Sequence, residues 1–251
     1  MSLSSFSLHQ KTILITGASS GIGKTCAIEC SKAGAQVILV GRNTQRLIET
    51  QIECKGETYT VAKDISSCEE LEELLMEINH IKKIDGIIHS AGKEVTLPFK
   101  KSKKTYFQDI FDINVFSGFE LTRLLLSNKK IEGAASIVFI SSAAALVGEP
   151  GKVIYSASKG ALLSGAKSLA MELSKQRIRV NTITPAIVNT PLVENMFENI
   201  GEEATEFIKN KHPFGLGDSK DVAMSCIFLL SDASKWITGT NIVLDGGYTS
   251  I

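Results

Sequence analysis

The stretch TILITGASSGIG, from Thr12 to Gly23, decides the fold. TILIT is a β-branched run typical of a buried strand, and the helix-like KTCAIECSKAGA follows directly after Gly23. The glycines between them allow a tight turn and a close approach of the backbone to a pyrophosphate, which the dipole and N–H groups of a helix N-terminus favour. Strand, glycine-rich turn and helix in this order predict the start of a dinucleotide-binding unit.

The end of the second predicted strand, QVILVGRN (Gln36 to Asn43), bears on the choice of cofactor. In such units an acidic side chain at this point accepts from the 2′-OH of NAD, whereas an arginine pairs with the 2′-phosphate of NADP. The sequence places Gly41 and then Arg42 there, with no carboxylate. We therefore expect NADP(H) to be preferred, with NAD(H) left open.

Predicted strands and helices alternate along the rest of the chain. The third strand ends at Asp64, where Ser66 and Glu69 form a capping-box signature for the next helix. Buried-type strands follow near residues 84–93, 136–142, 178–185 and 240–247. Without a linker, repeat or shift in composition, this alternation predicts an α/β fold: a single doubly wound Rossmann-type domain over residues 1–251, with a mostly parallel seven-stranded sheet and helices on both faces.

Four polar residues in this pattern are candidates for chemistry. Y-S-A-S-K, from Tyr155 to Lys159, begins a predicted helix, which places the phenol and the ammonium on one face. A cation one helical turn away favours the phenolate, so we expect Lys159 to lower the pKa of Tyr155. Ser142 ends a buried strand, and Asn114 interrupts an apolar helical pattern from Tyr106 to Leu126, where a buried amide needs a partner or serves a site.

Composition narrows the partners. Lys plus Arg and Asp plus Glu number 27 each, so no net field favours nucleic acid or an anionic membrane. Five scattered cysteines without a C-x-x-C pair indicate a reduced protein with buried thiols rather than disulfides or a metal site. No stretch approaches a membrane span and the N-terminus does not resemble a signal peptide, so we expect a cytoplasmic protein without a membrane partner.

The segment after Pro185 differs from the rest. It is amphipathic, is interrupted by Gly201 and Pro213, and shows no strand of its own. A long excursion of this kind at the carboxyl edge of a sheet is typical of an active-site lid. We expect residues of about 190–216 to cover the substrate, with Asp218 or Ser219 capping the helix that follows.

Taken together, these motifs resemble those of the short-chain dehydrogenase/reductase family, and within it the 3-oxoacyl-[acyl-carrier-protein] reductase-like members. The resemblance runs from about Lys11 to Thr249 and rests on TGASSGIG, Ser90-Ala91-Gly92, Asn114, Ser142, Tyr155 with Lys159, Pro185 with Thr190, and ITGTNIVLDGGYT. It implies NAD(P)-dependent interconversion of a carbonyl and an alcohol by hydride transfer, with a small-molecule substrate and a homotetrameric assembly.

The resemblance also implies roles for individual residues. The catalytic set would be Asn114, Ser142, Tyr155 and Lys159: Tyr155 the acid/base, Lys159 the holder of the nicotinamide ribose, Ser142 the residue that positions the substrate oxygen, and Asn114 the holder of a relay water. The positions implied to bind cofactor are Gly17, Ser19, Ser20, Gly21, Ile22, Gly23, Arg42, Asp64, Ile65, Ala91, Gly92, Asn114, Tyr155, Lys159, Pro185, Val188 and Thr190.

The sequence departs from the family pattern at three points. His89 replaces an asparagine before Ser90-Ala91-Gly92, and we expect it to be structural rather than catalytic. Ser20 stands where NADP-using relatives often carry a basic residue, which leaves Arg42 to select the phosphate. Gln176 aligns with the arginine by which fatty-acid-synthesis reductases hold acyl-carrier protein, although basic residues flank it.

Three functions stay open at this stage. The first is an NADP-dependent reductase of 3-oxoacyl thioesters or similar small ketones. The second is a sugar, polyol or steroid dehydrogenase of the same fold. The third is a cofactor-binding regulator without catalysis, against which the complete set of Asn114, Ser142, Tyr155 and Lys159 argues.

Overall fold

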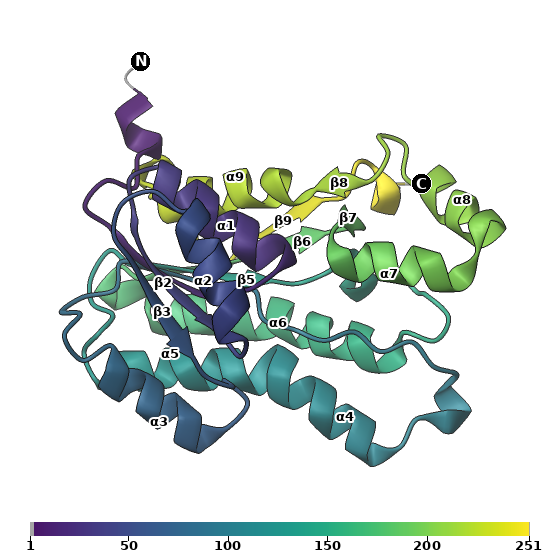
Figure 1. The fold of residues 1–251 in the computed structure, drawn as a ribbon, viewed down its shortest axis with the longest axis horizontal. Helices are drawn as coiled ribbons and strands as arrows, with labels where there is room; N and C mark the ends of the chain where they lie inside the picture. Colours follow the sequence, from purple (N-terminus) through teal and green to yellow (C-terminus); the bar gives the residue numbers. More distant parts are fainter. Residues whose placement is uncertain (1–2, 251) are drawn as a thin grey trace.

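A parallel sheet of seven strands forms the centre of the computed structural model, which describes residues 3–250 (Figure 1). The strand order is β3-β2-β1-β4-β5-β6-β9, and every neighbouring pair runs parallel. The strands are β1 (Thr12–Thr16), β2 (Gln36–Gly41), β3 (Thr58–Ala62), β4 (Gly86–His89), β5 (Ser136–Ile140), β6 (Arg179–Pro185) and β9 (Asn241–Leu244). The predicted doubly wound fold class is confirmed, and the sheet is wholly rather than mostly parallel.

Helices cover both faces of the sheet (Figure 1). They are α1 (Gly21–Lys32), α2 (Thr44–Glu53), α3 (Cys68–Glu77), α4 (Lys104–Phe111), α5 (Ser117–Ser127), α6 (Val153–Glu172), α7 (Pro191–Ile200), α8 (Glu202–Asn210) and α9 (Ser219–Leu230). Among these, α3, α5 and α6 pack on one face, and α1, α2 and α9 pack on the other.

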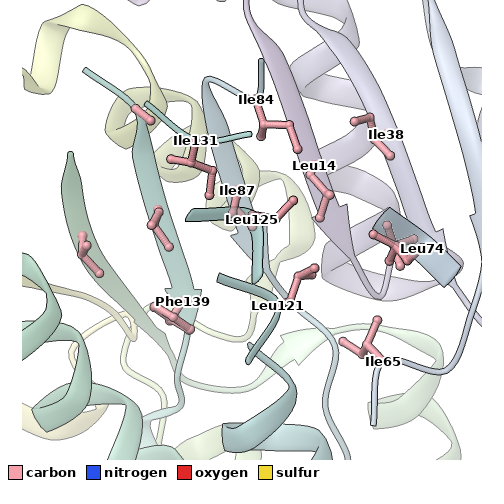
Figure 2. Packing of buried hydrophobic residues seen from close by; sticks show 14 of the residues in the cluster. Leu14, Ile38, Ile65, Leu74, Ile84, Ile87, Leu121, Leu125, Ile131 and Phe139 are labelled. Atoms are coloured by element: carbon pink, nitrogen blue, oxygen red, sulfur yellow. The ribbon is translucent and has the colours of Figure 1, made fainter. Parts of the chain in front are cut away.

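The two cores follow from the alternation of side chains along each strand. Leu14 of β1 packs with Leu74 of α3 and Leu121 of α5, as Figure 2 shows. Its neighbours Ile13 and Ile15 point to the opposite face and pack with α1 and α9. All are fully buried, and each such side chain contributes about 1.5–3 kcal/mol through its removal from water.

The strand order reverses between β1 and β4, since β1 pairs with β2 on one side and with β4 on the other. Ligands of open parallel sheets bind beyond the carboxyl ends of the strands at such a reversal. Helices α7 and α8 lie beyond this end of the sheet (Figure 1, right). The expectation that this segment has no strand is wrong: β7 (Val188–Asn189) pairs with β8 (Gly217–Asp218) across its two ends.

Two local expectations are corrected. Ser67, not Ser66, is the N-cap of α3, and its hydroxyl oxygen accepts from the N–H of Glu70 at 3.3 Å. Ser66 instead donates to Asp64 at 2.7 Å. The single helix expected over Tyr106 to Leu126 is divided into α4 and α5 by a π-helical segment, Asp112–Phe116, and π-helical turns occur frequently at functional sites.

Other features bear on predicted partners. Over residues 3–250, no helix is both long and apolar enough to cross a membrane. In the same range, no group of three or more His, Cys, Asp or Glu side chains is arranged to hold a metal ion. All five cysteines are free thiols, and Cys26 of α1 lies 3.8 Å from Cys226 of α9, sulfur to sulfur, inside the core. Of the two predicted caps of α9, Asp218 is the one observed.

Candidate active site

A cavity of about 660 Å³ lies at the carboxyl ends of the strands. The turn after β1, the ends of β2, β4, β5 and β6, the start of α6, and helices α7 and α8 line it. All of the site residues predicted from sequence line this cavity except Asn114. The fold therefore brings together residues from positions 17 to 190 of the chain.

The glycine-rich turn after β1 is built for close packing. Gly17 and Gly21 have φ angles of 70° and 51°, in the region that favours glycine. A Cβ on Gly17 would lie 2.9 Å from the backbone nitrogen of Ala91, and one on Gly23 would lie 2.3 Å from the carbonyl oxygen of Gly17. Larger residues at these positions would push the turn away from β4 and α1.

The first turn of α1 supplies donors at one end of the cavity. Its N-cap residue, Ser20, makes no side-chain capping hydrogen bond, so no side-chain cap occupies the first-turn N–H groups. Gly21, Ile22 and Gly23 line the cavity there. A helix N-terminus with free-standing donors suits a pyrophosphate, so the residues present fit a dinucleotide.

The cavity ends near β2 and β3 at Arg42 and Asp64. The guanidinium Nη1 lies 3.7 Å from a carboxylate oxygen of Asp64, and the arginine side chain is 62% exposed. Burial acts to raise the pKa of Asp64, but hydrogen bonds from Ser66 and the nearby cations outweigh it, and the net pKa is lowered. The carboxylate thus holds the arginine at the cavity rim, where its other N–H groups can reach a ligand.

Tyr155 and Lys159 lie one turn apart on α6, with the lysine Nζ 5.9 Å from the centre of the tyrosine ring. Burial raises the pKa of Tyr155 to about 12, although the Ser142 hydroxyl acts in the opposite direction. Burial also lowers the pKa of Lys159 to about 8. The expectation of a lowered Tyr155 pKa is therefore wrong: the net pKa is raised, because the removal of the phenol from water outweighs the opposing influences.

Ser142 lies between β5 and the tyrosine helix. It caps a short 3₁₀ turn, Ala143–Ala145, in which its oxygen accepts from the N–H of Ala144 at 3.3 Å. The hydroxyl is also hydrogen-bonded with Tyr155, which acts to lower the pKa of the phenol. Lys159 donates from Nζ to the carbonyl oxygen of Ile140 at 2.9 Å, which fixes the ammonium at the end of β5.

Asn114 lies behind the cavity wall in the π-helical segment and is 5% exposed. Its Oδ1 accepts from the backbone N–H of Lys93 at 2.7 Å, and its Nδ2 donates to the carbonyl oxygen of Lys93 at 2.9 Å and to Ser158 at 3.0 Å. The side chain thus ties the segment after β4 to α6. Its role in holding a relay water stays a prediction.

Thr190 connects the lid to the glycine-rich turn. It is the N-cap of α7, where its hydroxyl oxygen accepts from the N–H of Val193 at 3.4 Å. Its methyl group lies against Gly21, since a Cβ built there would be 3.4 Å from it. The predicted neighbours Pro185 and Val188 also line the cavity.

Sequence reasoning missed a group of polar residues around Tyr155. Glu94 pairs with Lys152, and Tyr248 donates to Glu149 at 2.8 Å. His212 of the lid stacks on Tyr248, with ring centres 4.7 Å apart and planes at 6°. These five residues line the cavity but were not predicted as site residues, because they come from four separate stretches of the chain.

His89, which replaces the family asparagine, is buried beside the site. Thr122 donates to the carbonyl oxygen of Gly118 at 2.8 Å, so at 2.9 Å it accepts from the Nε2–H of His89. The ring stacks on Phe139 at 4.5 Å, and burial lowers the pKa of His89 to about 3. This neutral, packed imidazole is absent from the cavity lining, as expected for a structural role.

Comparison with known proteins gives the family. Residues 17–249 match a family model described as enoyl-(acyl carrier protein) reductase. A tropinone reductase homolog of Arabidopsis thaliana is 33% identical over 97% of this chain and 92% of its own length. An NAD-dependent glycerol dehydrogenase of Listeria innocua is 32% identical over 97% of this chain and 96% of its own length.

Two further similar proteins are also oxidoreductases by name. The NADPH carbonyl reductase 2 of Sus scrofa is 32% identical over 94% of this chain and 95% of its own length. A crystal structure of a putative short-chain alcohol dehydrogenase from Sinorhizobium meliloti has a TM-score of 0.90 and 29% identity, covering 98% of this chain and 99% of that one. With the glycine-rich turn, Ser142, Tyr155 and Lys159 gathered at one cavity, this chain is an oxidoreductase that belongs to the NAD(P)-binding short-chain dehydrogenase/reductase family.

Proposed function

We propose that the protein is an NADP(H)-dependent oxidoreductase that interconverts a ketone and a secondary alcohol. The observation that carries the proposal is the meeting of Tyr155, Ser142 and Lys159 at the cavity that the glycine-rich turn also lines. When bound, a nicotinamide cofactor supplies or accepts the hydride. The protein contributes orientation and the proton.

In the proposed reduction, Tyr155 donates its phenolic proton to the carbonyl oxygen, and it takes the proton back from the alcohol in the reverse direction. Its raised pKa of about 12 keeps the phenol protonated at neutral pH, ready to donate. Ser142 donates a hydrogen bond to the same oxygen and positions it. Lys159 stabilises the phenolate that forms, because an opposite charge nearby favours the ionised form.

The preference for NADP(H) rests on Arg42. No carboxylate follows β2, and the guanidinium stands at the cavity rim, where a 2′-phosphate of the adenosine ribose would lie. Family membership alone leaves this choice open, because the relatives include one named for NAD and another named for NADPH.

The test is a panel of ketones incubated with NADPH, with cofactor oxidation followed by absorbance. Tyr155→Phe should lower turnover by about 10²–10⁴-fold while leaving NADPH affinity nearly unchanged. Tyr106→Phe, at an exposed tyrosine of α4, is the matched control and should retain activity. Full turnover by Tyr155→Phe would refute the mechanism. No turnover by the wild type on any ketone, despite tight NADPH binding, would favour the cofactor-binding regulator.

The proposed assembly is a homotetramer. The edge strand β9 exposes Val243, and Trp236 just before it is 96% exposed, an unusual state for an indole unless another surface covers it. Light scattering on the purified protein should give four times the chain mass, and Trp236→Glu should lower it. A monomeric mass at micromolar concentration would contradict this assembly.

A further inference from the structure

The substrate end of the cavity carries both acceptors and donors. Glu94, Glu149 and Lys152 surround Tyr155, and both carboxylates act to raise the pKa of its phenol, which requires them to lie near it. The Nζ of Lys152 lies 5.8 Å from the centre of the Tyr155 ring. A substrate whose carbonyl reaches Tyr155 therefore meets these groups with its adjoining atoms.

Glu149 has unused acceptor capacity. One of its oxygens accepts from Tyr248 at 2.8 Å, and among residues 3–250 its other oxygen accepts no hydrogen bond and no cation pairs with it. The side chain is only partly buried, and it lines the cavity. A donor group on the ligand could therefore bind this oxygen.

The lid contributes a second unused group. The Nδ1 of His212 lies 2.9 Å from the carbonyl oxygen of Ile208, which can only accept, so Nδ1 carries the proton. Nε2 is then an acceptor, and it has no partner within the described residues although the side chain is only 5% exposed. The residue lines the cavity against Tyr248.

The charges around the substrate are of both signs. Glu94 neutralises Lys152, and Lys93 and Lys211 also line the cavity. A cavity surface of mixed charge is not complementary to a fully anionic or a strongly cationic ligand. It is complementary to hydroxyl groups, because each can donate to a carboxylate and accept from an ammonium. An acyl thioester offers only acceptors beside its carbonyl and would leave the second carboxylate oxygen of Glu149 without a donor.

We infer that the substrate is an uncharged ketone with hydroxyl groups beside the carbonyl, held through them by Glu149 and the Glu94–Lys152 pair. The inference rests on the proposed function and narrows it to the sugar and polyol class. Apolar lid residues such as Met196 and Ile208 would cover the carbon skeleton.

The experiment compares three substrates with NADPH: erythrulose, butan-2-one and the acetoacetyl thioester of N-acetylcysteamine. Erythrulose and butan-2-one share one skeleton and differ only in hydroxyl groups. The wild type should show a kcat/KM for erythrulose at least about 100-fold above that for butan-2-one, because buried polar groups reject analogues that lack the matching donor. The thioester should rank below erythrulose.

Variants test whether Glu149 causes the preference for erythrulose over butan-2-one. Glu149→Ala should reduce the erythrulose-to-butanone ratio by about 10-fold or more, mainly through KM, and Glu149→Gln should restore part of it because the amide oxygen still accepts. Glu203→Ala, at an exposed lid position, is the control and should keep the ratio. Equal kcat/KM for erythrulose and butan-2-one, or a preference for the thioester, would overturn the inference while leaving a ketone reductase. Inactivity on all three would count against both proposals.

Discussion

The ammonium of Lys159 lies 5.9 Å from the centre of the Tyr155 ring, and burial moves their pKa values apart, to about 8 for the lysine and about 12 for the tyrosine. The lysine is therefore charged at neutral pH and loses its charge just above it, while the phenol stays protonated. Only below about pH 8 does a cation stabilise the phenolate that proton donation creates.

The rate of ketone reduction should depend on this lysine. In the free enzyme, kcat/KM should fall as the pH rises through about 8, where Lys159 deprotonates. Lys159→Ala should lower kcat/KM by about 10²-fold and abolish the inflection, whereas Lys167→Ala, exposed on the same helix, should keep both. Rates measured between pH 6 and 10 in one buffer system check this, and an unchanged inflection in Lys159→Ala would contradict it.

Arg42 should set the cofactor preference. Arg42→Ala removes the guanidinium at the rim, and charge-assisted hydrogen bonds of about 1.5–3 kcal/mol correspond to a loss of NADPH affinity of at least about 10-fold. NADH affinity should change little, because it lacks the 2′-phosphate. Fluorescence titrations with NADPH and with NADH measure the two dissociation constants. Arg46→Ala, exposed on α2, should alter neither, and a wild type that binds NADH more tightly than NADPH would reject this role.

Asn114 should matter for stability as well as turnover. Asn114→Ala leaves the backbone N–H and carbonyl of Lys93 without their partner, and each unsatisfied group costs about 1–3 kcal/mol. Urea unfolding should show this loss, and turnover should fall because the segment after β4 lines the cavity. Asn128→Ala, at an exposed position, should cost less than about 1 kcal/mol. If Asn114→Ala were as stable as the wild type, the two hydrogen bonds to Lys93 would not contribute to stability, and the prediction would be wrong.

The sequence predicts the features that depend on residues close together in the chain, and it misses those that depend on contacts between distant residues. The turn from Thr16 to Gly23 is local, since its glycines and flanking periodicity lie within a few residues, and the structure agrees. The contact between Glu149 and Tyr248 spans 99 positions, and no local pattern indicates that the two residues meet. The π-helical turn that places Asn114 and the burial that raises the pKa of Tyr155 both depend on tertiary packing, so local patterns do not reveal them.

His89 should give the protein a measurable sensitivity to acid. Its pKa is about 3 in the fold and ordinarily 6.5, so between these values the unfolded chain binds a proton that the folded chain does not. The contribution of His89 to the free energy of unfolding is therefore fully present above about pH 6.5. It decreases as the pH falls below that value, by up to about 1.4 kcal/mol per pH unit.

The test of His89 compares slopes rather than absolute stabilities, because His89→Asn also changes packing against Phe139. Urea unfolding at pH 7, 6 and 5 should show that the variant loses about 1 kcal/mol less per pH unit than the wild type between pH 6 and 5. His80→Asn, at an exposed histidine, should keep the wild-type slope. If the free energy of unfolding depends equally on pH in the wild type and in His89→Asn, His89 titrates near its ordinary pKa in the folded protein. That result would contradict a neutral imidazole bound to Thr122.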